Sequence, residues 1–228
     1  MGSKMNIDDH LGRVPVQAPA SDSRYDKWVR WATVITDEIH GIVGSRQIWR
    51  EVNQMVADHP ALPPSLFFDF LFDAYKNSQA IAVRRQRDEG PDDISLWKLM
   101  TEIRDHPEIC SRQRYVAKYD WGMQHLGEGD FDVLCGQGRD QMNPTQVEVD
   151  RARFGQVVDG VRHYVNRRVA HYDRRQFTAR PTLDDLDAAI DELTTTFGTY
   201  RQLVLGLPYT PPTIVDDWTA VFRVPWLP

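Results

Sequence analysis

Residues 156–175, QVVDGVRHYVNRRVAHYDRR, carry the pattern that decides the fold class. Apolar side chains recur here at separations of three, four, four and three residues, at Val158, Val161, Val165, Val169 and Tyr172. This spacing places them on one face of an α-helix, because each helical residue turns the chain by about 100°. Strand-like alternation is nearly absent elsewhere. We therefore predict an all-α fold, a helical bundle of four to six helices with irregular N- and C-terminal tails.

Polar side chains occupy the opposite face of this predicted helix, at His163, Arg167, His171 and Arg174. Arg167 and His171 are four residues apart and are therefore neighbours on a helix surface. Asn166 flanks the same face. Such a face is often simply the solvated side of an ordinary helix. The alternative is a site that handles phosphate, because arginine donates in a fork to phosphate oxygens and histidine exchanges a proton near neutral pH.

The charge of the chain is unevenly distributed. The formal net charge is −6, which disfavours a general nucleic-acid binder. Residues 151–180 nevertheless hold eight arginines against Asp159 and Asp173, a local charge of +6. Residues 181–193, PTLDDLDAAIDEL, are strongly acidic. This asymmetry favours an anionic ligand at the basic segment, since local fields rather than the average charge attract ligands.

Residues 1–21 hold prolines and small polar residues without periodicity, so we expect a disordered lead. A helical pattern follows and stops at the proline-rich residues 59–64, and Gly41 and Gly44 are candidate kinks within it. Ser65 is the expected N-cap of a second long helix, which should reach about Asp88.

The second half of the chain contains further start signals. Asp93 or Ser95 should open a short helix, and residues 107–126 should be helical in part. The glycine-rich residues 127–142 predict a loop without the lysine of a phosphate-binding loop. Asn143 and Pro144 should begin the helix that runs to about Tyr172.

A last long helix should run from a capping box at Thr182 and Asp185 to about Leu205. Residues 22–206 thus form one predicted helical domain. Residues 207–228 are rich in proline but include Trp218, Phe222 and Trp226, so we expect them to lie as a strap against that domain.

The composition of the chain limits which classes of protein it can belong to. Hydrophobic residues make up 41% and charged residues 26%, typical of a globular protein. We expect no membrane span, because no apolar run approaches about 18 residues, and no signal segment is evident. Cys110 and Cys135 have no paired spacing and should be free thiols in a cytoplasmic protein. We expect neither a metal nor a cofactor. Acidic residues cluster, without converging as ligands, at Asp184, Asp185, Asp187, Asp191 and Glu192.

Two segments resemble the HEPN superfamily, in particular its AbiU-like abortive-infection branch. In residues 79–108 a helix ends with Arg85 and Asp88, and a Ser-Leu-x-x-Leu helix follows. Residues 164–173, YVNRRVAHYD, are similar to the Arg-Asn-x-x-x-Ala-His-x-Asp stretch of that branch. With the order of the helices, the resemblance covers roughly residues 24–206.

The resemblance implies a homodimer whose motif histidines face a groove between the copies. It implies metal-independent RNA cleavage in a toxin or antiviral defence setting, with an antitoxin or other defence-system protein as partner. In the family's motif, four to six residues stand between an arginine and the histidine. Here Arg167 lies closer and Arg162 lies farther. A catalytically inactive HEPN module that binds a partner protein or a nucleotide is therefore the alternative, and a purely structural dimer is a third reading.

Under the ribonuclease hypothesis, His171 is the general acid or base, Arg167 holds the phosphate, and Asn166 positions a hydroxyl or phosphate oxygen. The remaining predicted contacts with RNA come from arginines, namely Arg162, Arg168, Arg174, Arg175 and Arg85.

Overall fold

The computed structural model describes residues 23–63, 65–169 and 181–224, apart from the side chain of Arg168. Within these ranges the chain forms helices and one isolated bridge between Ser111 and Gln141, and no strand. Six α-helices have ten residues or more, so the all-α prediction is confirmed. The predicted lead, residues 1–21, lies outside the described residues. None of the helices in the described ranges is both long and apolar enough to cross a membrane.

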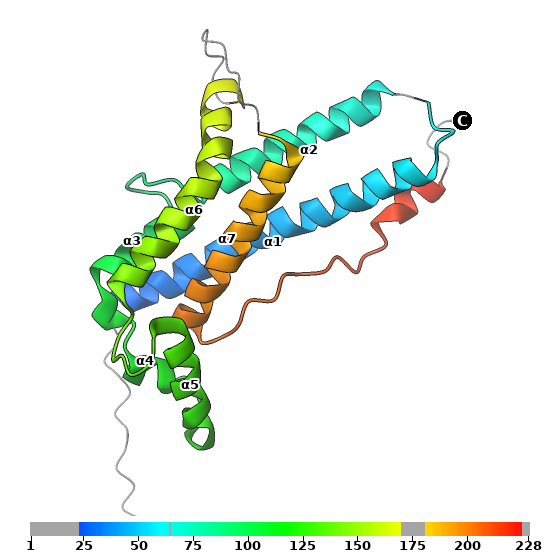
Figure 1. The fold of residues 1–228 in the computed structure, drawn as a ribbon. Coiled ribbons are helices and arrows are strands. Elements are labelled where there is room, and N and C mark those ends of the chain that lie inside the picture. Colours follow the sequence, from blue (N-terminus) through cyan, green and yellow to red (C-terminus); the bar gives the residue numbers. More distant parts are fainter. Residues whose placement is uncertain (1–22, 64, 170–180, 225–228) are drawn as a thin grey trace, which may run out of the picture.

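The two N-terminal helices form a long hairpin (Figure 1). The first, α1 (Ser23–Asp58), is one continuous helix that includes Gly41 and Gly44, the two candidate kinks. The second, α2, spans Leu66–Arg85. Its predicted cap is confirmed, because the Ser65 hydroxyl accepts a hydrogen bond from the Phe67 N–H. The helix ends three residues before the predicted Asp88.

The first half of α1 packs with α3 (Leu96–Asp105), α6 (Pro144–Tyr164) and α7 (Leu183–Leu205) around one core. Ser95, rather than Asp93, caps α3, and Asn143 caps α6. The capping box of α7 is complete, since Thr182 and Asp185 each bond the other's backbone N–H. The predicted valine stripe is also confirmed as core, because Val158, Val161 and Val165 are fully buried and Val169 packs against them.

The α-helix that carries this stripe is shorter than we predicted. It ends at Tyr164, and η3 (Val165–Val169) continues as a π-helix. A π-helix bonds residue i to i+5, so it widens the turn and shifts the side chains that follow. The α-helical phase expected for Arg167 therefore does not hold beyond Val165, and His171 lies outside the described residues. Tyr172 lies outside the described residues.

The glycine-rich loop predicted at residues 127–142 is wrong over its first half, where α5 (Gln124–Cys135) forms instead. Gly127 has a packing role, since a Cβ there would lie 2.7 Å from the ring of Tyr119. Phe131 is fully buried and lies 5.6 Å from the Tyr115 ring. Tertiary packing therefore outweighs the low helix propensity of glycine. The turns at Gly136 and Gly138, which have positive φ, form the true loop.

Short elements connect the long helices. A 3-10 turn η1 (Pro107–Ile109) precedes α4 (Arg112–Val116), and η2 (Trp121–Met123) leads into α5. Cys110 and Cys135 are free and buried, as predicted. Burial raises the pKa of both thiols to about 12, which keeps them protonated.

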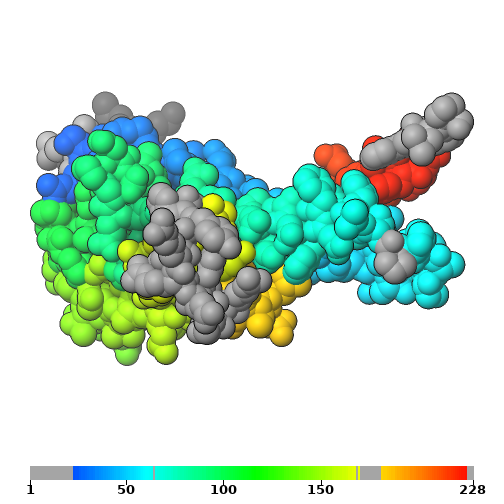
Figure 2. Space-filling model, turned by 90° about the horizontal axis from the view of Figure 1, so that it is seen from above, coloured from blue at the N-terminus to red at the C-terminus, as the bar shows by residue number. Residues whose placement is uncertain are grey.

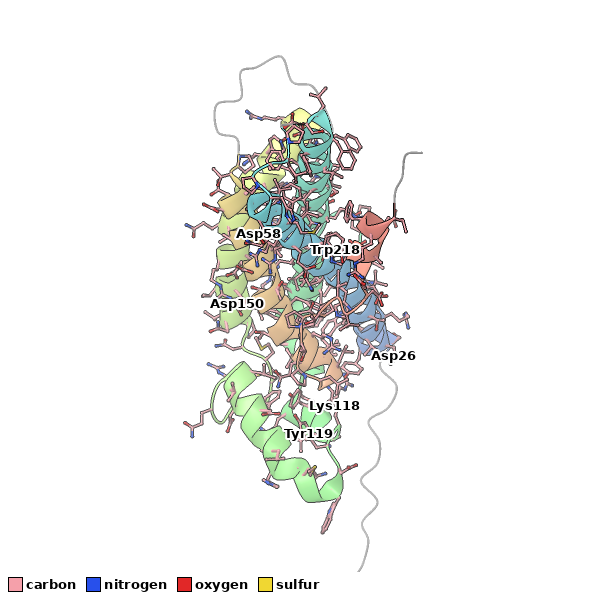
Figure 3. The ribbon with its side chains drawn as sticks, turned by 90° about the vertical axis from the view of Figure 1, so that its right-hand side faces the viewer. Asp26, Asp58, Lys118, Tyr119, Asp150 and Trp218 are labelled. Atoms are coloured by element: carbon pink, nitrogen blue, oxygen red, sulfur yellow. The ribbon has the colours of Figure 1, made fainter. Side chains whose placement is uncertain are left out.

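The C-terminal segment runs along α1 after α7 ends at Leu205, with Gly206 as its C-cap (Figure 1). The Gln47 side chain bonds both backbone groups of Ile214, accepting from its N–H at 2.9 Å and donating to its carbonyl at 3.3 Å. Trp218 then donates to Glu51 from η4 (Trp218–Arg223), which lies beside α1 (Figure 3).

Both helices of the hairpin are divided into a buried half and an unburied half. The buried residues of α1 end at Gly44, and those of α2 begin at Gln79. We call residues 45–58 and 66–78 the arm, and the rest of the helical core the body. Figure 2 shows the arm projecting from the body, with η4 beside it.

Candidate functional site

The described part of the predicted site lies where α6 passes into η3. Arg162 is in the last turn of α6, and Asn166 and Arg167 are in the π-helix, all three half-buried. His163 is exposed between them. His171, Arg174 and Arg175 lie outside the described residues, and so does the side chain of Arg168. The structure therefore brings Arg162, Asn166 and Arg167 to one end of the body.

Helix α2 runs beside this end of α6. The Tyr164 hydroxyl donates to the Asn77 side chain at 3.2 Å. The positive charge of Arg162 is close enough to the Asp88 carboxyl to favour its ionised form. Burial raises the pKa of Asp88, and Arg84, 3.5 Å away, opposes that shift. The α2 end that resembles the family motif thus lies next to the α6 end that carries the predicted site.

Two of the predicted RNA-binding arginines have carboxylate partners within the chain. Arg162 pairs with Asp159 at 3.6 Å, and Arg85 pairs with Glu38 on α1. Both arginine side chains remain at least a third exposed, so each pair contributes little to stability. The Asp159 oxygen that faces Arg162 is buried without a hydrogen-bond partner, so this ion pair is the contact that compensates its charge.

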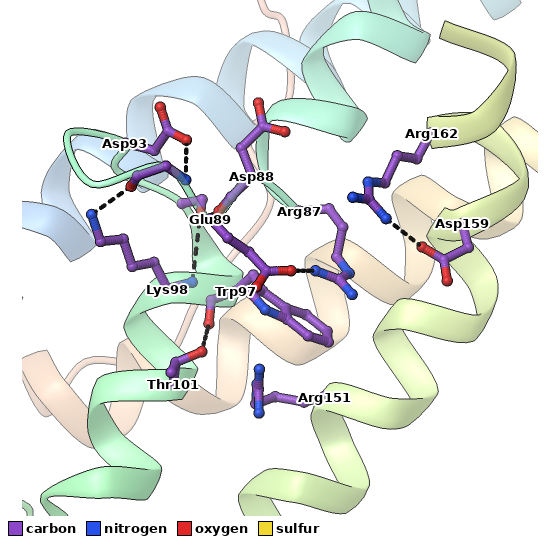
Figure 4. A network of polar contacts seen from close by, with 12 residues as sticks. Arg87, Asp88, Glu89, Asp93, Trp97, Lys98, Thr101, Arg151, Asp159 and Arg162 are labelled. Carbon is purple, nitrogen blue, oxygen red and sulfur yellow. Dashed lines mark hydrogen bonds and ion pairs between the residues drawn. The ribbon is translucent and has the colours of Figure 1, made fainter. Parts of the chain in front are cut away.

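A second cluster, which the sequence did not reveal, joins the α2–α3 turn to α6 (Figure 4). The guanidinium carbon of Arg87 lies 3.1 Å from the ring centroid of Trp97, and that of Arg151 lies 4.2 Å from it. Arg87 pairs with Glu89, and Arg151 pairs with Glu148. The cation–π geometry and the ion pairs together fix the turn against α6.

The cluster is nearly closed to solvent. The side chains of Arg87 and Arg151 are 11% and 8% exposed. Their Nε atoms and the Trp97 indole nitrogen are buried without a hydrogen-bond partner. Gly155 makes room for the stack, since a Cβ there would lie 3.3 Å from the Trp97 ring. Because each arginine already has an acidic partner, the cluster is best explained as a structural support for the end of α6.

These contacts also reduce the local charge predicted for residues 151–180. Arg151 and Arg153 are paired with Glu148 and Glu192, which lie outside this window, whereas Arg162 pairs with Asp159, which the count already includes. Glu148 lies three residues before Arg151 on the same helix, but the pair of Arg153 with Glu192 joins α6 to α7 and cannot be read from composition. The exposed positive field of the segment is therefore weaker than its sequence indicates.

The acidic start of α7 also has partners. Asp187 and Asp191 pair with Arg46 and Arg50 of α1, and Glu192 accepts from Arg153 at 2.8 Å. No group of three or more candidate metal ligands occurs among the described residues. Comparison of the chain with models of protein families, with curated proteins and with solved structures gives no match.

Proposed function

We propose that this chain is a metal-independent ribonuclease of toxin or phage-defence type, with a HEPN-like site at the end of α6. One observation supports this most directly. The chain leaves α-helical geometry at Val165–Val169, which ends two residues before His171 in the sequence. Single π turns inside α-helices cost stability and occur frequently at functional sites. The departure falls within the stretch that resembles the family motif.

In this proposal His171 moves the proton of the RNA 2′-hydroxyl, and Arg167 stabilises charge on the phosphate. Asn166 orients an oxygen of the same phosphodiester. In this proposal Arg167, which lies on the π turn, takes the place of the family's more distant arginine. Two copies of the chain face each other across the RNA.

The arginines around the site supply affinity rather than chemistry. Arg162 and Arg85 exchange Asp159 and Glu38 for phosphate, and Arg168, Arg174 and Arg175 extend the same surface. Binding should weaken steeply with salt, since each phosphate that is neutralised releases a counterion. Replacing Arg174 and Arg175 with alanine should reduce that salt dependence.

The test is cleavage of single-stranded RNA by His171→Ala and Arg167→Ala, with Arg223→Ala as the control. Arg223 is two-thirds exposed on η4 and remote from α6 in sequence. We expect each site variant to lose roughly 10²- to 10⁴-fold in rate, the usual contribution of one acid–base or charge-stabilising group. EDTA should change nothing, and the product should carry a 2′,3′-cyclic phosphate.

Cleavage that persists in His171→Ala would mean that the site lies elsewhere. If the unmodified protein cuts no RNA, the result would favour the alternative function, a catalytically inactive HEPN module that binds a nucleotide or a partner such as an antitoxin. Binding of RNA or nucleotide without turnover would support it.

A further inference from the structure

A cavity of about 610 Å³ opens between the end of α5 and the start of α6. Its lining comes from the last turn of α5, from the loop that follows, from the first turns of α6 and from Thr199 of α7. The volume falls within the range of small-molecule sites, about 300–1,000 Å³. Asp150 in the lining and Tyr164 at the other end of α6 are about 21 Å apart along the helix, so the cavity is separate from the candidate site.

The loop presents an arginine to this cavity. Arg139 is exposed, and no carboxylate in the described ranges lies within ion-pair distance of its guanidinium. Gly136 has a φ of 97°, and a Cβ there would lie 3.3 Å from the Arg139 Nε, so the side chain folds back across this glycine. Arg112 holds the loop in place, because its Nε donates to the Arg139 carbonyl at 2.8 Å. The free positive charge is therefore carried by a fixed backbone.

A second donor lies in the same lining. The side-chain oxygen of Asn143 accepts from the Thr145 N–H at 3.1 Å as the cap of α6. This leaves the Asn143 amide nitrogen free to donate, since no partner for it occurs in the part of the chain that the structure describes. A guanidinium and an amide nitrogen are donors only, and a carboxylate, whose two oxygens only accept, suits them both.

Another part of the lining carries an excess of negative charge. Asp150 is buried, and Arg153 lies 3.3 Å from it and donates to Glu192 at 2.8 Å. We call these three residues the acidic group, because two carboxylates and one arginine leave a net charge of −1. The Asp150 carboxylate also accepts from Tyr200 at 3.0 Å and from Gln146 at 3.1 Å. It can accept about four hydrogen bonds, so one position remains for a ligand.

Neutral acceptors complete this part of the cavity. Gln146 stands one turn after Asn143 and one turn before Asp150 on α6. Its amide nitrogen donates to Asp150, so its carbonyl oxygen is available to a ligand. The lining thus changes from donors to acceptors within about 10 Å along α6. A phosphate monoester would meet the acidic group without a compensating cation, whereas a zwitterion matches both ends.

We propose that this cavity binds a free amino acid with an aliphatic side chain. Its carboxylate pairs with Arg139 and accepts from the Asn143 amide. Its ammonium donates to the Gln146 carbonyl and faces the acidic group. Asn143 and Gln146 are neighbours on α6, with about 5–6 Å between their Cβ atoms, which one α-amino acid bridges. The side chain of the ligand covers the apolar wall of Val133 and Leu134 on α5, where Val133 is 86% exposed.

This inference goes beyond the proposed function, because neither RNA nor His171 takes part in it. The test is a titration of the isotope-labelled full chain followed by NMR chemical shifts. The probes are leucine, isocaproate, which is leucine without its amine, and isoamylamine, which is leucine without its carboxylate. Leucine should bind with a Kd on the order of a millimolar or tighter. Each of the other two should bind at least about tenfold more weakly, because it leaves one end of the cavity without its partner.

Two variants test the carboxylate end. Arg139→Gln should weaken leucine binding at least about tenfold, since it removes the charge that pairs with the carboxylate. Arg30→Gln is the matched control, because Arg30 is also exposed without an acidic partner in the described ranges and does not line the cavity. Asn143→Asp keeps a capping side chain on α6 but repels a carboxylate, so binding should weaken while the unfolding temperature stays unchanged.

Several results would overturn the proposal. One is the absence of any shift with leucine at about 10 mM, roughly ten times the weakest expected Kd. Another is equal binding of leucine and isocaproate, or tighter binding of inorganic phosphate than of leucine, since either would show that only an anion is recognised. A third is leucine binding that Arg139→Gln leaves as strong as Arg30→Gln does.

Discussion

Helices α1 and α2 run through both the arm and the body, yet their aromatic residues are buried to different extents in the two regions. In the body, Trp28 of α1 is fully buried and its indole N–H donates to Glu102 at 2.8 Å. In the arm, Trp49 of the same helix is half-buried, and its indole nitrogen has no hydrogen-bond partner. Composition is similar in the two halves. The difference comes from the elements that pack across each half.

In the body, α1 packs with α3 and α7 in the common core. In the arm, α1 has α2 on one side and the C-terminal segment on another, and it meets α7 through the ion pairs of Arg46 and Arg50 with Asp191 and Asp187. An apolar side chain contributes to stability only in proportion to the area that its neighbours remove from water. The arm therefore carries apolar surface that contributes little to folding, which leaves it free for association.

The largest expected effect comes from the two tryptophans that define this contrast. Trp28→Ala should lower the free energy of unfolding by about 3–5 kcal/mol, because it leaves a cavity in the body. It also leaves Glu102 without one of its donors. Trp49→Ala should cost about 1–2 kcal/mol, since a half-buried ring loses less area. Urea denaturation measures both, and equal losses would show that the arm is as well packed as the body.

A second comparison of the body with the arm uses Lys118, whose contribution to the stability of the body should depend on pH. This lysine is largely buried in the body and donates to the Leu203 and Val204 carbonyls at the end of α7. Burial lowers the pKa of Lys118 from 10.5 to about 8. Between these two values the unfolded chain binds more protons than the folded one, so the contribution of Lys118 to stability rises with pH. The full change is on the order of 3 kcal/mol, from about 1.4 kcal/mol per pKa unit.

The measurement is the difference in unfolding free energy between the wild type and Lys118→Met at several pH values. That difference should move in favour of the wild type as pH rises from 8 to 10.5. Subtraction removes the tyrosines and thiols that both proteins share, such as Tyr25, whose pKa burial raises to about 12. A difference that does not depend on pH would mean that Lys118 is as well solvated when folded as when unfolded.

Two glycines of α6 test how tightly the body is packed. Gly155→Ala should destabilise the protein by about 1–3 kcal/mol, because the new methyl group lies 3.3 Å from the Trp97 ring, which is fixed by its two arginine partners. Gly160→Ala is the matched control, since Gly160 is exposed with nothing within 4 Å of an added Cβ. It should stabilise the same helix by about 0.5–1 kcal/mol through helix propensity. Thermal unfolding distinguishes the two, and effects of the same sign would contradict the packing described for Trp97.

The smallest effect concerns the helix caps. Thr182→Ala removes the capping box of α7 and should cost about 1 kcal/mol of global stability. Ser65→Ala removes the cap of α2 at the tip of the arm and should cost less, because the end of an unburied helix frays without unfolding the body. Hydrogen exchange of the first amides of α2 and α7 measures both losses. A global loss from Ser65→Ala would show that the arm and the body unfold together.

The sequence predicted those features that depend on neighbours along the chain. The caps at Ser65, Asn143 and Thr182 are correct, because a capping side chain bonds backbone groups two or three residues away. The valine stripe is correct because helical periodicity is a local property. The same reasoning failed at α5, where Gly127 indicated a loop and the ring of Tyr119 occupies the space of its missing side chain.

The candidate site was predictable only in part, for the same reason. Residue types in the stretch from Arg162 to His171 suggested phosphate chemistry. The π turn at Val165–Val169, which lies next to the contact of Tyr164 with Asn77 of α2, was not foreseen. The carboxylate partners of Arg162 and Arg85 were also not foreseen. The second partner is Glu38, 47 residues away, which no local pattern can reveal.

The sequence by itself determined that this protein is all-α, where most of its helices begin, and that one face of α6 is core. Each of these follows from the helical period and from the hydrogen bonds of the backbone, which involve residues only a few positions apart in the chain. The tertiary structure alone decided the stacking of Arg87 and Arg151 on Trp97, and the exposure of Phe67 and Phe70. The physical reason is that burial and charge pairing are properties of surfaces brought together, and a side chain acquires them only from residues distant in the chain.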